Sequence, residues 1–117
     1  MDAIKAGFLD FLAQAKSDRR KIAAYGAAAK GNTFLNYCGV SKEDIVCVFD
    51  RSAAKQNKLL PGSHIPVLAP ERLADIKPDY LVILPWNIAD EIRAQNRALS
   101  TWGGKFVTAI PQLRILP

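Results

Sequence analysis

A glycine turn organises this sequence: Tyr25-Gly26-Ala27-Ala28-Ala29-Lys30-Gly31-Asn32-Thr33. Residues 21–25 form a short apolar run, and residues 31–38 carry apolar side chains at helical spacing. A buried strand that ends at glycine and restarts as a helix leaves unbonded backbone amides at the helix start, where they can bind phosphate. The turn is therefore predicted to connect a strand to a helix and to bind an anion.

Strands and helices alternate along the rest of the chain. The patterns predict helices at residues 3–16, 31–38, 70–76 and 87–102, and strands at residues 21–25, 45–49, 66–68, 80–84 and 105–110. Asn87 is expected to cap the fourth helix, and Gly103-Gly104 to end it. Pro111 and Pro117 bracket what we expect to be a tail.

The alternation predicts a mainly parallel sheet covered on both faces, because parallel neighbours are joined by crossover helices. We expect one Rossmann-like domain over residues 1–117, a three-layer α/β/α sandwich. If strand 21–25 lies beside strand 80–84, the strand order reverses between them, and the ligand crevice opens at their carboxyl ends. The loops at residues 26–32 and 85–87 would then face each other.

The glycine pattern departs from the common nucleotide-binding motifs. Asp50 lies 24 positions after Gly26, close to the spacing at which dinucleotide-binding folds place a carboxylate on a ribose. However, Ala28 stands where a second glycine should admit a pyrophosphate, which argues against a standard NAD site. Asn32 and Thr33 follow Gly31 where a P-loop needs Lys and Ser or Thr, so the turn is not a P-loop either.

Four ordered segments carry a family resemblance: residues 25–39, Asp50-Arg51 with Lys55-Gln56, residues 60–66, and Leu84-Pro85-Trp86-Asn87. Together they resemble the C-terminal domain of the S-adenosylmethionine (SAM)-dependent nucleotide-sugar C-methyltransferases. In that family a base removes a proton beside a ketone of a nucleotide-linked deoxysugar, and the enolate carbon takes the methyl group of SAM. The resemblance implies that a zinc-binding domain and a methyl-donor-binding domain precede this one in a longer methyltransferase.

The resemblance also implies roles for particular residues. Those expected to bind the nucleotide sugar are Lys30, Gly31, Asn32, Thr33, Asn36, Trp86 and Asn87. His64 is the candidate catalytic residue, as a donor to substrate or a proton relay. For several of these residues a structural role is the alternative: Asn32 or Thr33 would only cap a helix, His64 would be a surface residue, and Trp86 would form a lid rather than stack on a base. Trp102 is expected in the core.

The composition of the chain limits the classes of molecule that we expect it to bind. The net charge is +5, but the one dense basic cluster, Arg19-Arg20-Lys21, has no interleaved aromatic residues, so a solvated turn is preferred to a nucleic-acid surface. No apolar run approaches the roughly 20 residues of a membrane span, and the start lacks the pattern of a secretory signal. We therefore expect a cytoplasmic protein that binds neither nucleic acid nor membrane. Cys38 and Cys47 lack metal-ligand spacing and should be buried thiols.

Three functions remain open on the sequence alone. The preferred one is the substrate-side domain of a nucleotide-sugar C-methyltransferase, which helps to bind the sugar nucleotide and closes the site. In this reading the chain itself holds no cofactor or metal, and its partner is the methyl-donor-binding domain of the same polypeptide. The alternatives are a nucleotide-binding or regulatory module without chemistry, and an NAD-dependent oxidoreductase fragment, which the missing second glycine disfavours.

Overall fold

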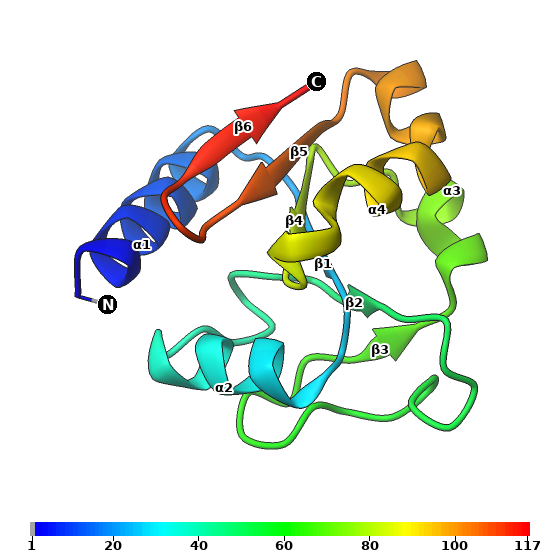
Figure 1. Cartoon of the computed structure of the whole chain (residues 1–117), viewed down its shortest axis with the longest axis horizontal. Coiled ribbons are helices and arrows are strands. Elements are labelled where there is room, and N and C mark those ends of the chain that lie inside the picture. The colour runs from blue at the N-terminus through cyan, green and yellow to red at the C-terminus, as the bar shows by residue number, and fades with distance from the viewer. Residues whose placement is uncertain (1) are drawn as a thin grey trace.

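The computed structural model describes residues 2–117, which form one six-stranded sheet with the order β3-β2-β1-β4-β5-β6 (Figure 1). Neighbouring strands are parallel except β5 and β6, which are antiparallel. The strands are β1 (Ile22–Tyr25), β2 (Val48–Phe49), β3 (Val67–Leu68), β4 (Tyr80–Ile83), β5 (Lys105–Thr108) and β6 (Arg114–Leu116). β1 pairs with β4, so the condition stated from the sequence is met and the strand order reverses between these two strands.

Helices cover both faces of the sheet, which gives three layers. One face carries α1 (Asp2–Ser17) and α2 (Ala29–Tyr37), as Figure 1 shows on its left and lower sides. The other carries α3 (Leu73–Ile76), α4 (Ala89–Gln95) and the 3-10 helix η3 (Arg97–Trp102). Two further 3-10 turns, η1 (Pro70–Arg72) and η2 (Trp86–Ile88), precede α3 and α4. The predicted Rossmann-like α/β fold is confirmed.

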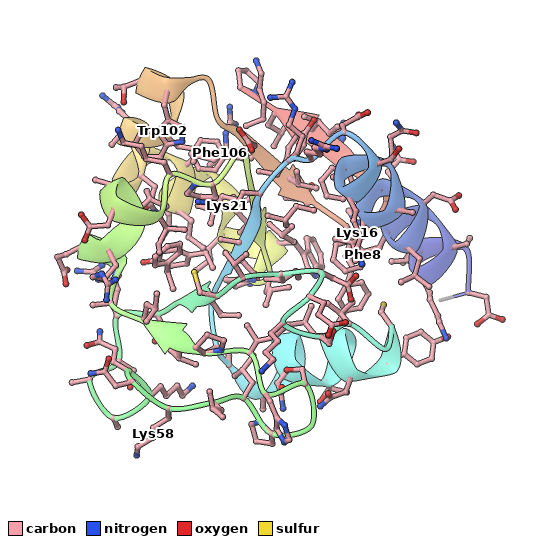
Figure 2. The ribbon with its side chains drawn as sticks, turned by 180° about the vertical axis from the view of Figure 1, so that it is seen from behind. Phe8, Lys16, Lys21, Lys58, Trp102 and Phe106 are labelled. Atoms are coloured by element: carbon pink, nitrogen blue, oxygen red, sulfur yellow. The ribbon has the colours of Figure 1, made fainter. Side chains whose placement is uncertain are left out.

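The strands are buried on both sides because their side chains alternate between the two helical layers. In β1, Ala24 faces the core beneath α1 and α2, whereas Ala23 and Tyr25 face the core beneath α3 and α4. Phe8 of α1 is 0% exposed, and its ring centroid lies 5.3 Å from that of Phe34 in α2. Figure 2 shows Phe8 on the side of α1 that faces the other elements. This aromatic pair joins α1 and α2 over the sheet.

The second strand is shorter than predicted. We expected residues 45–49, but β2 contains only Val48 and Phe49. The preceding residues still bond to β1, since the Ala24 amide donates to the Cys47 carbonyl at 3.0 Å. On its other side β2 pairs only with the two residues of β3, so the strand has neighbours on both sides over just two residues.

The predicted fourth helix is broken, and Asn87 does not cap it. α4 begins after Ile88 and has no side-chain cap. It ends at Asn96, a buried residue whose Nδ2 donates to the Ile92 carbonyl at 2.8 Å. Because this side chain competes for a helix carbonyl, the chain leaves the α conformation and continues as η3. The predicted stop is confirmed, since Gly103 follows η3 with φ of +80°.

The expected tail after Pro111 is in fact a strand. β6 pairs antiparallel to β5, with Val107 opposite Ile115. Only three residues form β6, and Pro117 follows it, so the segment is too short to show a period of two in the sequence. The sheet therefore ends in an antiparallel edge.

The basic cluster lies in the turn between α1 and β1. Lys21 donates from Nζ to the Ile76 carbonyl at 2.9 Å, and its amide donates to Asp79 Oδ2 at 2.7 Å. Arg20 lies 3.9 Å from Asp79. The cluster thus partly serves to hold this turn against the segment between α3 and β4.

Among the described residues, none of the helices combines the length and apolarity needed to cross a bilayer.

Both cysteines are buried, as predicted: Cys38 is 5% and Cys47 1% exposed. Burial raises the pKa of both thiols, and it raises that of Cys47 to about 11 from 9.0. The thiolate of Cys47 should therefore be about 100-fold scarcer near neutral pH than that of an unperturbed thiol.

We expect both thiols to react slowly with iodoacetamide at pH 8 in the folded protein and at the rate of a free thiol in urea. Because folding raises the pKa of Cys47, the neutral buried thiol contributes to the free energy of unfolding below about pH 9. This contribution is lost as the pH rises toward about 11. Mass spectrometry of timed samples measures the reaction. Rapid labelling of either residue in the folded protein would contradict the burial.

Candidate functional site

A pocket of about 620 Å³ opens at the carboxyl ends of β1, β4 and β5. Three segments line it: the glycine turn with the start of α2, the end of β4 with η2, and the residues after β5. The lining residues are Gly26, Ala28, Ala29, Lys30, Gly31, Phe34, Val82, Ile83, Leu84, Pro85, Trp86, Asn87, Ala109 and Ile110. The pocket lies where the strand order reverses, which is where open α/β sheets bind ligands.

The glycine turn packs directly on the segment after β4. Gly26 has φ of +99°, and a Cβ added to it would lie 2.6 Å from Cδ of Pro85. A Cβ on Gly31 would lie 3.0 Å from Cβ of Leu84. Both positions thus need the smallest side chain, and the predicted meeting of loops 26–32 and 85–87 is observed.

The start of α2 offers unbonded amides to the pocket. Its N-cap is Ala28, which makes no side-chain cap. The amides of Ala29, Lys30 and Gly31 therefore have no acceptor within the helix. We expected the amides of Gly31, Asn32 and Thr33, but the Asn32 amide donates to the Ala28 carbonyl at 3.0 Å. The helix starts about two residues earlier than predicted, and neither Asn32 nor Thr33 caps it.

Lys30, Trp86 and Asn87 meet at this pocket, and all three are exposed. Lys30 is the one titratable side chain among the residues that line it. Trp86 is 47% exposed and also borders a neighbouring groove of about 440 Å³ between η2 and the residues flanking β6. The pocket therefore combines an apolar wall with a positive rim.

The other predicted site residues do not line this pocket. Asn36 donates from Nδ2 to the Pro61 carbonyl at 3.1 Å and packs against Gly62. His64 is exposed in the loop between β2 and β3, with φ of +62°. Thr33 is exposed on α2, and Asn32 is half-buried there. The structure thus groups Lys30, Gly31, Trp86 and Asn87, and it places Asn32, Thr33, Asn36 and His64 outside the pocket lining.

Asp50 does not point to a ligand, although its spacing resembles that of a ribose-binding carboxylate. Its Oδ2 accepts from the Ala27 amide at 2.7 Å, and its Oδ1 accepts from the Ser52 amide at 2.8 Å. Both carboxylate oxygens are engaged by the protein itself. The residues of this turn therefore do not fit the ribose of an adenosine cofactor in the usual dinucleotide mode.

Part of the pocket wall was not predicted from the sequence. Ala109 and Ile110 line the pocket directly after β5, and Phe34, predicted only as a core residue, also lines it. The position of residues 109 and 110 at the end of a parallel strand could have indicated them, because the carboxyl ends of parallel strands share one edge.

Comparison with known proteins identifies the family of this chain. A family model described as the C-methyltransferase C-terminal domain matches residues 1–111. The chain belongs to this family. It is also 35% identical over 115 residues to C-methyltransferase NovU from Streptomyces niveus, which covers 98% of the chain and 27% of NovU. The C-methyltransferase domain thus spans about a quarter of this relative's length.

The family resemblance implies that SAM and zinc are bound by the longer methyltransferase. Among residues 2–117, no three His, Cys, Asp or Glu side chains gather as a metal site. Each Asp50 oxygen accepts from one backbone amide, so the carboxylate that would hold an adenosine ribose is already used to fix the turn. The part of the chain that the structure describes thus offers no donor set for zinc, and its candidate ribose ligand already bonds within the protein.

Proposed function

We propose that this C-methyltransferase domain binds a nucleotide-linked deoxysugar for a SAM-dependent enzyme and helps to close the active site over it. The observation that carries the proposal is the pocket in which the unbonded amides of α2 and Lys30 meet an apolar wall. A sugar nucleotide presents both kinds of surface, since its pyrophosphate is anionic and its base and deoxysugar carry apolar faces.

The pyrophosphate would lie at the start of α2. The amides of Ala29, Lys30 and Gly31 and the positive end of the helix dipole favour an anion there. Lys30 would add a charge-assisted hydrogen bond. Trp86 would stack on a flat part of the ligand or cover it, and the Asn87 amide would bond to a hydroxyl or carbonyl. This arrangement supplies binding and orientation rather than acid–base chemistry.

The catalytic base would then lie in another domain. Lys30 is the one titratable residue in the lining, and a protonated lysine cannot accept the proton beside a ketone. His64 stays a candidate for proton transfer only if the substrate extends beyond the pocket to the loop between β2 and β3. The same observation favours the alternative function, a nucleotide-binding module without chemistry.

The methyl-donor-binding domain of the same polypeptide would cover the pocket mouth. Trp86, which is 47% exposed, borders the pocket, and Ile88, which is 40% exposed, lines the neighbouring groove beside it. Apolar surface of this kind is commonly buried against a partner. Closure would exclude water from the reacting carbon. We place the enzyme in the cytoplasm, where nucleotide sugars are available, and propose no nucleic-acid or membrane partner.

Calorimetric titration with a deoxysugar nucleotide tests the proposal. We expect one weak site, and we expect Lys30→Ala to weaken binding about tenfold, which corresponds to about 1.4 kcal/mol. Lys58→Ala is the matched control, because Lys58 is an exposed lysine outside the pocket, on the loop between β2 and β3 (Figure 2).

Two results would contradict the proposal. Equal losses in Lys30→Ala and Lys58→Ala would mean that the ligand follows net charge and not the pocket. Saturable micromolar binding of SAM to this chain would mean that the domain holds the methyl donor instead of the sugar nucleotide. Binding of the nucleotide with no methyl transfer in a reassembled full-length enzyme would favour the module without chemistry.

A further inference from the structure

The peptide groups of Ala27 are held by two side chains from a distant segment. The carboxylate of Asp50 accepts from the Ala27 amide at 2.7 Å, and Nζ of Lys55 donates to the Ala27 carbonyl at 3.2 Å. Ala27 is 7% exposed, so water has little access to this residue. A buried amide or carbonyl left without a partner is costly, and these two side chains supply both partners.

The segment that carries these two side chains is anchored to the sheet at Asp50. The Asp50 amide donates to the Leu68 carbonyl at 3.0 Å, next to the pairing of β2 with β3. The Asp50 carbonyl accepts from Gln56 Nε2 at 2.8 Å, and its Oδ1 accepts from the Ser52 amide. The segment from Asp50 to Gln56 is thus a compact loop, and it holds Ala27 from the side of β2.

Ala27 lies between Gly26, which packs on Pro85, and Ala28, which is the N-cap of α2. The direction of the first α2 amides therefore depends on how the Ala27 peptide is oriented. Pro85 limits the turn from the β4 side, whereas Asp50 and Lys55 fix it from the β2 side. The amides that would bind the anion are aimed by contacts on both sides.

We infer that Asp50 and Lys55 are positioning residues that orient the start of α2 for anion binding through the Ala27 peptide. The carboxylate at the position where related folds bind a ribose instead holds the protein's own backbone. The inference rests on the proposed function insofar as it concerns ligand affinity, and it makes a separate statement about the unliganded turn.

The test compares Asp50→Asn and Lys55→Met with Lys58→Met in the 117-residue chain. An asparagine offers one oxygen and one NH₂ group, so it can accept from only one of the two amides that Asp50 now satisfies. Lys55→Met removes the donor to the Ala27 carbonyl, and Lys58→Met removes the same charge from the same loop without that contact. The probes are UDP, which carries a ribose and a base, and inorganic pyrophosphate, which carries neither.

If the two residues position the turn, Asp50→Asn should weaken the binding of UDP and of pyrophosphate by the same factor, about tenfold, and Lys55→Met should weaken both by about threefold. Thermal unfolding shows whether each variant is folded. Lys58→Met should leave both affinities nearly unchanged. If Asp50→Asn weakens UDP alone, Asp50 contacts the ribose and the inference is wrong. Equal affinities in all variants, or an equal loss in Lys55→Met and Lys58→Met, would also overturn it.

Amide hydrogen exchange in the unliganded protein keeps the inference separate from the proposed function. The Ala27 amide, which bonds to Asp50, and the Asn32 amide, which bonds to the Ala28 carbonyl, should exchange faster in Asp50→Asn and Lys55→Met than in Lys58→Met, because the turn has lost a tether. Unchanged exchange in both variants would overturn the inference. Failure of the unaltered protein to bind either probe, with this exchange pattern intact, would refute only the anion site.

Discussion

Replacing Gly26 with alanine should lower the free energy of unfolding by about 2–4 kcal/mol and abolish anion binding at the start of α2. Two causes act together. The backbone has φ of +99°, which a residue with a Cβ rarely adopts, and the new Cβ would lie 2.6 Å from Cδ of Pro85. Because Pro85 is rigid and also lines the pocket, the turn must move away from it.

Gly39→Ala separates these two causes. Gly39 also has a positive φ, +70°, but an added Cβ would meet nothing within 4 Å. This control should lose only about 1 kcal/mol, from backbone strain, and should bind anions normally. Urea unfolding of both variants measures the difference. A loss in Gly26→Ala no larger than that in Gly39→Ala would mean that the turn does not pack on Pro85.

Replacing Phe8 with alanine should remove about 3–5 kcal/mol, a large part of the stability of a domain of this size. Phe8 is 0% exposed and packs against Phe34, which lines the pocket. Truncation would leave a cavity between α1 and α2. It should also loosen the pocket wall, so ligand affinity should fall in variants that remain folded.

Leu9→Ala is the matched control, since Leu9 is the next residue of α1 and is 36% exposed. Its loss should be about 1 kcal/mol or less, because alanine favours helix and Leu9 buries less of its side chain than Phe8 does. Urea unfolding monitored by circular dichroism gives both values. Similar losses in the two variants would contradict the packing of α1 on this sheet, since one side chain is fully buried and the other is not.

The parallel sheet and the place of the pocket could be predicted because each depends on local pattern. Apolar runs that end at Gly26 and Pro85, separated by helical segments, indicate two parallel strands with their carboxyl ends at one edge of the sheet; that the two strands are neighbours was only a condition and is supplied by the structure. Burial of Cys38 and Cys47 followed from their apolar neighbours in the same way.

Other features depend on tertiary contacts that the local pattern does not contain. The spacing of Asp50 fits a ribose ligand as well as it fits the Ala27 amide, and only the direction of that amide decides between them. Asn36 was predicted to bind substrate from one turn further along the helix, but the loop at Pro61 and Gly62 packs against it, and the Pro61 carbonyl accepts from its Nδ2. The break at Asn96 likewise depends on one side-chain hydrogen bond, and the short strand β6 depends on its pairing with β5.

The most direct test of the sugar-nucleotide site is a titration of the ¹⁵N-labelled chain with a nucleotide diphosphate deoxysugar, followed by amide resonances. We expect the largest shifts at residues 26–31, 82–87 and 109–110, the three segments that line the pocket, and weaker effects near His64. Shifts confined to residues 16–21, the exposed basic turn after α1, would show that the anion follows surface charge and would contradict the proposed site.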